Sequence, residues 1–370
     1  MPEKNRSRDK TTGLIIGKFL PFHNGHRHLI DSARRQVDEL FVLVCTLQRE
    51  IIPGAVRYNW IREHYADDPG VRVFHNTDEN PQEPEEHPDF WNIWDRSIRR
   101  FFPGTDLPDV LFSSEHYGFP LAERLGIRHT PIDIDRSVVP ISGTAIRAEP
   151  YRLRQHLPDI VRPYFVKKIV ITGPESCGKT TLAARLAERF ATGWAPEYAR
   201  EYLETNNVHI DDLRADHIPP IARGHADQED RLTTAAATNN NGLLFLDTDL
   251  IVTKIYARHY FGACPDWIRK EAATRARRYD LQILLTPDVP WVADDLRNLA
   301  HERTNMFHEF ESELKQHGAR YIVLPLPTAS QTSAGDHAGD PLENRFNARF
   351  DAAVTLVQEI LREPFSERGA

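Results

Sequence analysis

Residues 13–37 read GLIIGKFLPFHNGHRHLIDSARRQV, which is a short apolar run, a turn and a stretch with helical periodicity. An apolar, β-branched run between glycines predicts a buried strand, and apolar residues three and four apart predict an amphipathic helix. The turn holds Asn24-Gly25, a pair typical of turns, and the two histidines His23 and His26. This order starts an α/β fold and places both histidines at the carboxyl end of a strand, where such sheets bind ligands.

Strand–helix alternation continues along the chain and predicts an α/β protein with two doubly wound parallel sheets. In the first part we expect strands at 13–17, 39–46, 71–76, 109–114 and 128–134, and helices at 25–37, 55–66, 89–102, 120–127 and 142–150. In the second part we expect strands at 166–172, 243–249, 281–286 and 321–326, and helices at 178–190 and 343–363. The expected organisation is a disordered lead-in over 1–12, a first domain over 13–150, a proline-containing linker over 151–165 and a second domain over 166–370.

Composition narrows the class of protein. A chain of 370 residues is long for one core and comfortable for two domains, and 40% hydrophobic with 27% charged residues is typical of a soluble globular protein. The net charge of −8, with the positive residues spread out, makes nucleic acid an unexpected partner. No apolar stretch approaches the ~18–20 residues that span a bilayer. Three widely spaced cysteines argue against a disulfide scaffold, so we expect a cytoplasmic protein that does not insert into membranes.

The stretch GPESCGKT, residues 173–180, matches the P-loop pattern G-x-x-x-x-G-K-[ST] between a predicted strand and a predicted helix. In this motif backbone N–H groups wrap the phosphates, so Lys179 would reach the β- and γ-phosphates and Thr180 would hold Mg²⁺. A plain glycine-rich surface turn is the alternative, and the strand–helix context disfavours it. The residues expected to bind ATP here are Gly173, Ser176, Gly178, Lys179, Thr180 and Thr181.

Carboxylates downstream of the P-loop favour a small-molecule kinase over a motor ATPase. FLDTD, residues 245–249, ends an apolar run, so Asp247 is expected to join Thr180 at Mg²⁺. In 293–298 we expect a lid whose Arg297 neutralises charge on the transferring phosphoryl group. Each of these residues alone is more often part of a surface ion pair. The expected substrate-binding residues of this half are Glu197, Tyr198, Arg200, Asp247 and Asp249.

Three alternative roles can be considered for His23 and His26: metal binding, packing in the core and contact with phosphates. A metal pair would need further ligands, and the other histidines are scattered along the chain. Core histidines fit poorly with the turn residues between them. In the third use, Gly25 lets a ligand approach the backbone while both imidazoles stabilise charge on the α-phosphate and departing pyrophosphate. This third use gains support from residues 138–150, VVPISGTAIRAEP, because hydroxyls and an arginine at a helix start form an anion site.

The first half resembles the HxGH nucleotidyltransferase superfamily. Gly17, Phe19, Pro21, His23, Gly25 and His26 complete its G-x-F-x-P-x-H-x-G-H motif, and Ile141, Ser142, Thr144 and Arg147 complete its I-S-x-T-x-x-R motif. With the P-loop half carrying EYARE and LDTD, residues 13–362 resemble the NadR-type bifunctional enzymes. These join nicotinamide mononucleotide (NMN) adenylyltransferase to ribosylnicotinamide kinase.

The resemblance implies substrates and roles. The substrates would be nicotinamide riboside, NMN and ATP, with Mg²⁺, and the chain would make NAD. The catalytic residues would be Lys18, His23, His26 and Arg147 in the first half, and Lys179 with Glu197 or Asp249 in the second. Further ATP contacts would come from Gly17, Phe19, Gly25, Ser142 and Thr144. For Trp91 and Trp94, packing in the core and stacking on the pyridine ring both stay open.

Several points stay open at this stage. Some relatives begin with a helix-turn-helix domain; about a dozen residues precede GLIIG here, so we expect that module and its DNA-binding role to be absent. A same-superfamily transferase fused to a different kinase, and a nucleotide-sensing regulator with little turnover, are the alternative functions. The sequence leaves open the order of loop 328–340, the oligomeric state (a homo-oligomer included), transfer of NMN between sites and an effector role for NAD.

Overall fold

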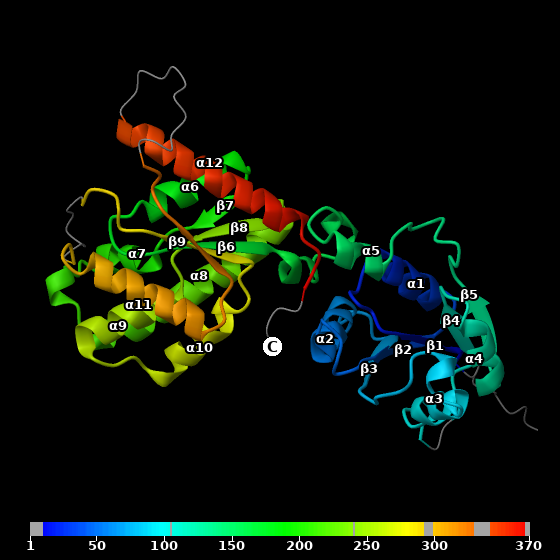
Figure 1. The fold of residues 1–370 in the computed structure, drawn as a ribbon. Helices are drawn as coiled ribbons and strands as arrows, with labels where there is room; N and C mark the ends of the chain where they lie inside the picture. The colour runs from blue at the N-terminus through cyan, green and yellow to red at the C-terminus, as the bar shows by residue number, and fades with distance from the viewer. Residues whose placement is uncertain (1–9, 104–105, 240, 292–298, 329–340, 367–370) are drawn as a thin grey trace, which may run out of the picture. The chain divides into compact units, whose positions relative to one another are not determined.

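The computed structural model describes residues 10–103, 106–239, 241–291, 299–328 and 341–366. Contacts divide the chain into two compact units (Figure 1). Unit 1 comprises the described residues up to Val161 together with 364–366, and unit 2 runs from Arg162 to Glu363. The backbone amide of Phe365 donates to the carbonyl of Arg147 at 2.7 Å, so residues 364–366 pack within unit 1.

Unit 1 is built on a parallel five-stranded sheet in the order β3-β2-β1-β4-β5. Its strands are β1 (Thr12–Gly17), β2 (Glu39–Cys45), β3 (Val71–Asn76), β4 (Val110–Ser113) and β5 (Arg128–Pro131). Its helices are α1 (Asn24–Arg34), α2 (Gly54–His64), α3 (Phe90–Arg99), α4 (Gly118–Leu125) and α5 (Gly143–Ala148). Short 3-10 turns occupy Pro84–Glu86 and Arg154–His156. The central strand β1 carries the HxGH turn at its carboxyl end.

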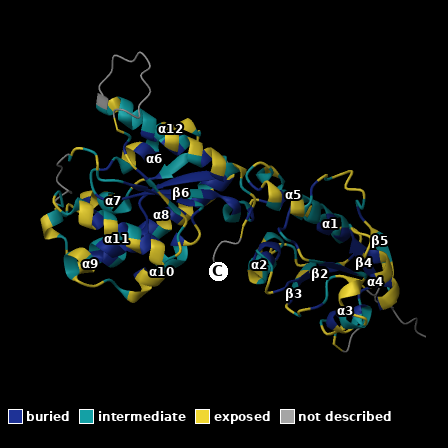
Figure 2. Ribbon diagram, in the orientation of Figure 1, coloured by how far each residue is buried: buried dark blue, intermediate teal, exposed yellow. Residues whose placement is uncertain are grey.

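The core of unit 1 forms because each central strand buries apolar side chains on both faces. On one face, Ile98 of α3 and Leu121 of α4 pack against Leu14 of β1 and Leu43 of β2. Helices α1 and α2 lie on the opposite face of the sheet (Figure 1). Figure 2 shows the central strands mostly buried and the outer helix surfaces exposed, whereas the edge strands β3 and β5 are only partly buried.

Unit 2 is built on a second parallel five-stranded sheet, in the order β10-β9-β6-β8-β7. Its strands are β6 (Lys167–Thr172), β7 (Gly193–Ala195), β8 (Leu243–Asp247), β9 (Leu281–Leu285) and β10 (Tyr321–Leu324). Its helices are α6 (Lys179–Arg189), α7 (Tyr198–Thr205), α8 (Ile218–Asn239), α9 (Leu250–Phe261), α10 (Asp266–Ala276), α11 (Arg303–Gln316) and α12 (Pro341–Arg362). Short 3-10 turns occupy Arg162–Phe165, Ile210–Asp212 and Ala215–His217.

Helices cover both faces of the second sheet: α6 and α12 lie on one side, and α8 to α11 lie on the other (Figure 1). Val170 of β6 and Leu246 of β8 pack against Ala236 of α8. A second buried cluster joins Ile255 of α9 and Phe310 of α11 to the sheet. The predicted fold class, two doubly wound parallel sheets, is therefore confirmed.

Some elements differ from the sequence prediction. Strand β1 begins at Thr12, whose amide donates to Asp109 at 2.7 Å, and the amide of Thr11 donates to Asp38, so these residues of the expected lead-in are anchored. Residues 151–165, the expected linker, form turns and 3-10 turns. The long helix α8 and helices α9 to α11 were not singled out from the sequence. Among the described residues, no helix is long and apolar enough to cross a membrane.

Candidate active sites

The HxGH turn in unit 1 is held by its own first histidine. His23 caps helix α1, because its Nδ1 accepts hydrogen bonds from the backbone amides of Gly25 (3.1 Å) and His26 (3.3 Å). A neutral imidazole that accepts at Nδ1 carries its proton on Nε2. A Cβ atom on Gly25 would lie 2.9 Å from Cε1 of His23, so a glycine is needed for this close approach. The cap therefore leaves His23 with Nε2–H as its free donor.

The two imidazoles form a stacked pair. The ring centroids of His23 and His26 are 3.8 Å apart at 18°, and Phe19 meets His26 edge-on at 4.9 Å. Burial, followed by the charge of Arg136, lowers the pKa of His23 to about 3. Burial, followed by the charge of His23, lowers the pKa of His26 well below its usual value. Both rings are therefore neutral near pH 7 and act as hydrogen-bonding groups, not as cations. In the described residues, no three His, Cys, Asp or Glu side chains gather at a potential metal site.

The second motif lies directly against the first. Ser142 caps α5 by accepting from the amide of Ala145 at 3.1 Å. Arg147 donates to Thr144 Oγ1 at 3.1 Å and to the carbonyl of Leu20, inside the HxGH turn. A Cβ atom on Gly143 would come within 2.4 Å of that same carbonyl. Residues more than a hundred positions apart in the chain thus form one site.

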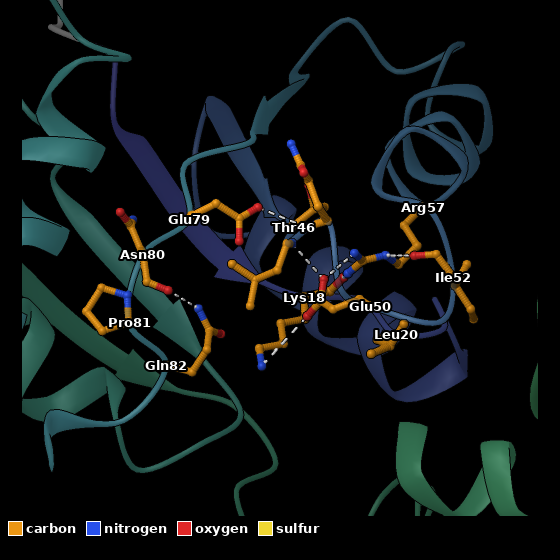
Figure 3. A network of polar contacts seen from close by, with 12 residues as sticks. Lys18, Leu20, Thr46, Glu50, Ile52, Arg57, Glu79, Asn80, Pro81 and Gln82 are labelled. Atoms are coloured by element: carbon orange, nitrogen blue, oxygen red, sulfur yellow. Dashed lines mark hydrogen bonds and ion pairs between the residues drawn. The ribbon is translucent and has the colours of Figure 1, made fainter. Parts of the chain in front are cut away.

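Lys18 lies beside a buried ion pair that the sequence did not reveal (Figure 3). Its Nζ is 3.8 Å from Glu50, and its own side chain is about half exposed at 47%. Arg57 of α2, with a fully buried side chain, donates to the Lys18 carbonyl at 2.6 Å, to the Ile52 carbonyl at 3.0 Å and to Glu50. Arg57 thus stabilises the backbone of the loop that carries Lys18. In the sequence Arg57 was one of several charged residues on a helix, and no local pattern marked it.

These residues surround a cavity of about 1170 Å³ in unit 1. Its walls include Lys18, His23, His26, Thr144 and Arg147, together with Gly17, Phe19, Gly25, Ser142, Trp91 and Trp94. Trp91 and Trp94 also pack against the core, and Trp94 Nε1 donates to the Pro81 carbonyl at 2.9 Å. Both alternatives for the tryptophans thus have structural support. Arg136 also lines the cavity and was missed from the sequence.

The P-loop of unit 2 connects β6 to α6 with three residues in the left-handed region. Gly173 has φ 138°, Ser176 has φ 55° and Gly178 has φ 90°. A Cβ atom on Gly173 would lie 2.8 Å from the Leu285 carbonyl, so the loop passes close to β9. Glycine tolerates these angles at no steric cost, whereas Ser176 adopts its angle only because neighbouring contacts hold it.

Thr180 and Asp247 meet at the base of this loop. Thr180 Oγ1 donates to Asp247 Oδ2 at 2.5 Å, and Asp247 Oδ1 is buried with no hydrogen-bond partner among the described residues. Burial, followed by the charge of Glu197, raises the pKa of Asp247 to about 6. A hydroxyl and a carboxylate oxygen are the hard donors that Mg²⁺ takes together with water and phosphate oxygens. The residues present therefore fit the predicted magnesium site.

Lys179 is the first residue of α6, directly after the P-loop glycine Gly178. Its Nζ donates to the Pro174 carbonyl at 2.8 Å, within the loop. Burial opposes its charged form, yet nearby acidic groups, first Cys177 and then Glu197, raise the pKa of Lys179. Its ammonium group is therefore positive at every physiological pH.

The predicted substrate residues of unit 2 separate into two groups. Glu197 and Arg200 line a cavity of about 160 Å³ beside the P-loop. Asp249 instead caps α9, accepting from the amides of Ile251 (3.0 Å) and Val252 (3.4 Å). Burial raises the pKa of Asp249 to about 7. Tyr198 packs on α8, where a Cβ atom on Gly224 would lie 2.0 Å from its ring.

The cavity of unit 2 also has walls that the sequence reading missed. Tyr256 and Tyr260 of α9 line it with ring centroids 6.1 Å apart, and His225 of α8 lies there as well. Burial lowers the pKa of His225 to about 4, so this ring is neutral. One helical turn separates the two tyrosines in the sequence, but most other walls of this cavity come from other elements, among them the P-loop, α7 and α8. Arg297 and most of loop 328–340 lie outside the described residues.

Two parallel sheets, one carrying an HxGH cavity and the other a P-loop with a threonine–aspartate pair, define a nucleotide-dependent transferase with two sites. The cytidylyltransferase-like family model matches residues 14–149, and the AAA domain model matches residues 168–331. The trifunctional NAD biosynthesis/regulator protein NadR of Escherichia coli (strain K12) is 30% identical over 96% of this chain and 84% of that protein. The chain belongs to the NadR family, as its motifs predicted.

Other similar proteins are also members of the NadR family. NadR of Salmonella typhimurium (strain LT2) is 30% identical over 96% of this chain and 85% of its own. A crystal structure of NadR in complex with NAD and AMP-PNP covers 98% of this chain and 99% of its own, with 25% identity and a TM-score of 0.74. A NadR structure in complex with NR covers 98% and 97% with a TM-score of 0.67. Both solved structures thus match this chain over both units.

Proposed function

We propose that this chain is a bifunctional enzyme of NAD salvage. Its kinase site phosphorylates nicotinamide riboside to NMN with ATP, and its nucleotidyltransferase site joins NMN to the adenylyl group of a second ATP. The observation that carries the proposal is that one chain of the NadR family holds both complete sites, the HxGH cavity and the P-loop with Thr180 and Asp247.

In the kinase step, the 5′-hydroxyl oxygen of nicotinamide riboside attacks the γ-phosphorus of ATP, the bond to the β-phosphate oxygen breaks, and ADP leaves. Lys179 and the loop amides bind the phosphates. Thr180 and Asp247 would hold Mg²⁺, which neutralises phosphate charge when bound. Of the two candidate carboxylates, Glu197 lines the cavity whereas Asp249 caps α9. We therefore assign orientation of the hydroxyl, and acceptance of its proton, to Glu197.

In the adenylyl step, a phosphate oxygen of NMN attacks the α-phosphorus of ATP, and the bond to the β-phosphate breaks to release pyrophosphate. No covalent intermediate forms, so positioning and charge stabilisation supply the rate. His23 and His26 act as neutral N–H donors because burial lowers the pKa of each. Lys18 and Arg147 supply the positive charge from opposite motifs. Trp91 or Trp94, both in the cavity wall, offers a flat face to the cationic nicotinamide ring.

The remaining expectations belong to this proposal as predictions. They are the requirement for Mg²⁺, a cytoplasmic location and the lid role of Arg297. Magnesium has the support of the orphaned Asp247 oxygen beside Thr180.

The test is incubation of the purified protein with ATP, Mg²⁺ and nicotinamide riboside, followed by chromatography of the products. We expect NMN to appear first and NAD to follow, with ADP and pyrophosphate as co-products. Active protein that consumes ATP with a different riboside, and forms no nicotinamide product, would overturn the substrate assignment. A folded protein that binds ATP without any turnover would point to the regulator.

A further inference from the structure

Two arginines from outside the P-loop hold consecutive carbonyls of that loop. Arg303, the first residue of α11, donates to the Ser176 carbonyl at 3.2 Å. Arg349, in the middle of α12, donates to the Cys177 carbonyl at 3.1 Å. Neither arginine belongs to a recognised motif, and neither lines the cavity beside the loop. Their contacts fall on the stretch of backbone that would wrap a phosphate.

The geometry of the peptide group gives these contacts a consequence. In a planar trans peptide, the carbonyl and the following N–H point in opposite directions. Holding the Ser176 carbonyl therefore aims the Cys177 amide, and holding the Cys177 carbonyl aims the Gly178 amide. Lys179 does the same within the loop, since its contact with the Pro174 carbonyl aims the Glu175 amide. With these carbonyls held, the amides of Glu175, Cys177 and Gly178 each point away from the group that holds the preceding carbonyl.

Both arginines are themselves fixed by one short segment after β9. Arg349, only 2% exposed, donates to Asp288 at 2.6 Å and to Thr286 Oγ1 at 3.3 Å. Arg303 donates to the Val289 carbonyl at 2.9 Å and lies over the ring of Trp291 at 5.8 Å. The segment 286–289 thus links the end of β9 to the P-loop through two guanidinium groups.

The backbone conformation of Ser176 also indicates that contacts from outside hold the P-loop in place. Ser176 has φ 55°, a left-handed conformation that costs a non-glycine residue of order 1–3 kcal/mol unless its surroundings hold it. Arg303 contacts the carbonyl of this very residue. A hydrogen bond at that point offsets the strain and keeps the loop in one conformation.

Resting on the proposed kinase function, we propose that Arg303 and Arg349 are positioning residues: they aim the Cys177 and Gly178 amides at the phosphates of a nucleoside triphosphate. They act through the backbone and do not touch the nucleotide. Loss of either contact should weaken ATP binding in the kinase site and leave adenylyl transfer in unit 1 unchanged.

The experiment uses the full chain with Arg303→Lys and Arg349→Lys, which keep the charge but lose the planar fork of donors. Arg185→Lys is the matched control, because Arg185 joins α6 to α12 through Asn347 (2.9 Å) and Phe350 (4.4 Å), with no contact to a P-loop carbonyl among its described contacts. Loss of one hydrogen bond predicts an ATP KM raised about three- to tenfold in the kinase reaction. NMN-to-NAD conversion should stay within about twofold of wild type, as should the control.

A spectroscopic measurement distinguishes a change in the orientation of the Cys177 amide from a loss of protein stability. The chain has three cysteines, so ¹⁵N-cysteine labelling gives three backbone amide resonances, and Cys177→Ser identifies the one in the loop. We expect Mg²⁺-ATP to shift the Cys177 resonance in wild type and to shift it less, at saturation, in Arg303→Lys. Because Arg303 begins a helix, this variant carries the test even if Arg349→Lys fails to fold.

The outcomes are distinguishable. A wild-type Cys177 resonance that does not respond to ATP, with no phosphorylation of nicotinamide riboside, would overturn the kinase function and this inference with it. A wild-type response combined with an unchanged ATP KM and an unchanged Cys177 shift in Arg303→Lys would overturn the positioning role alone.

Discussion

Thr180 and Asp247, 67 positions apart in the chain, are joined by a hydrogen bond of 2.5 Å from the threonine hydroxyl to the carboxylate. The bond ties the first turn of α6 to the carboxyl end of β8. Asp247 is 1% exposed, and within the described parts of the chain its other oxygen has no hydrogen-bond partner. The fold therefore keeps a costly buried carboxylate beside the P-loop, where it would serve the proposed Mg²⁺ as a ligand.

Asp247→Asn should lower kinase activity and raise stability at the same time. The folded-state pKa of about 6 lies above the ordinary 3.8, so stability falls as the pH rises from 3.8 through 6, and the loss is complete above that pH. This difference corresponds to about 3 kcal/mol at pH 7.5, which the neutral amide regains. We expect at least about 100-fold lower kinase kcat/KM, with higher resistance to urea. A variant less stable than wild type at pH 7.5 would contradict the assignment.

Lys179→Ala should stop the formation of NMN and leave the conversion of NMN to NAD unchanged. Removing the partly buried ammonium group takes away charge stabilisation at the phosphates, a loss of about 100- to 1,000-fold in kcat. The adenylyl site lies in the other unit, so NMN-to-NAD conversion should be unchanged. Chromatography of the products from riboside and from NMN, run in parallel, measures both steps. Loss of both steps in a folded variant would mean that the two sites are not independent.

His26→Ala should show the reverse pattern. Its ring lies against His23 at 3.8 Å in the cavity wall, and its Nδ1 is buried with no partner in the structure. We expect adenylyl transfer to fall about 100-fold or more and riboside phosphorylation to stay within about twofold. Thermal unfolding serves as the control for folding. Equal loss of both reactions, or retained NAD formation, would exclude the proposed role.

The sequence predicted the elements that carry strong local patterns. Residues 71–76, VRVFHN, were expected as a strand and are β3, because two valines flank an arginine and Phe74 follows them. Helix α8 was missed, since its start, Ile218-Pro-Pro, carries no capping residue and its body mixes threonine and alanine with charged residues. Local pattern was too weak there, and tertiary packing makes the helix.

The site residues also divide into those that local sequence patterns predicted and those that they did not. Motif residues such as His23 and Lys179 were predicted because backbone geometry demands fixed spacing at a turn. Arg57 and Arg303 were not, because each acts on a carbonyl 39 or 127 positions away. Such contacts exist only after the sheet brings the segments together. In the linear sequence these arginines look like any solvated charge on a helix.

The histidine cap makes unit 1 sensitive to acid. The folded-state pKa of His23, about 3, lies below the ordinary 6.5, so the unfolded chain binds the proton more readily. Stability is therefore complete above pH 6.5 and falls by about 1.4 kcal/mol per pH unit as the pH drops toward 3. His23→Asn retains a capping acceptor but cannot titrate. Between pH 7 and pH 5 this variant should lose about 2 kcal/mol less than wild type in urea unfolding followed by tryptophan fluorescence; equal losses would contradict the prediction.

Arg57→Met should strongly destabilise unit 1, although the two side chains are similar in length. The change leaves Glu50, 8% exposed, without its buried partner and removes donors from the Lys18 and Ile52 carbonyls. Breaking a buried ion pair from one side costs about 3–5 kcal/mol. Arg62→Met is the matched control on the same helix, because Arg62 is 52% exposed and pairs only loosely with Glu63 at 3.4 Å. That change should stay within about 0.5 kcal/mol.

The readout for this pair is urea unfolding combined with both activities. Arg57→Met should lose adenylyl transfer at a urea concentration where wild type and Arg62→Met retain it, while riboside phosphorylation persists in all three. If the two variants unfold together, the Arg57–Glu50 pair does not support the Lys18 loop. If Arg57→Met keeps wild-type stability but loses adenylyl transfer without urea, Arg57 acts on the loop's conformation and not on the folding of unit 1.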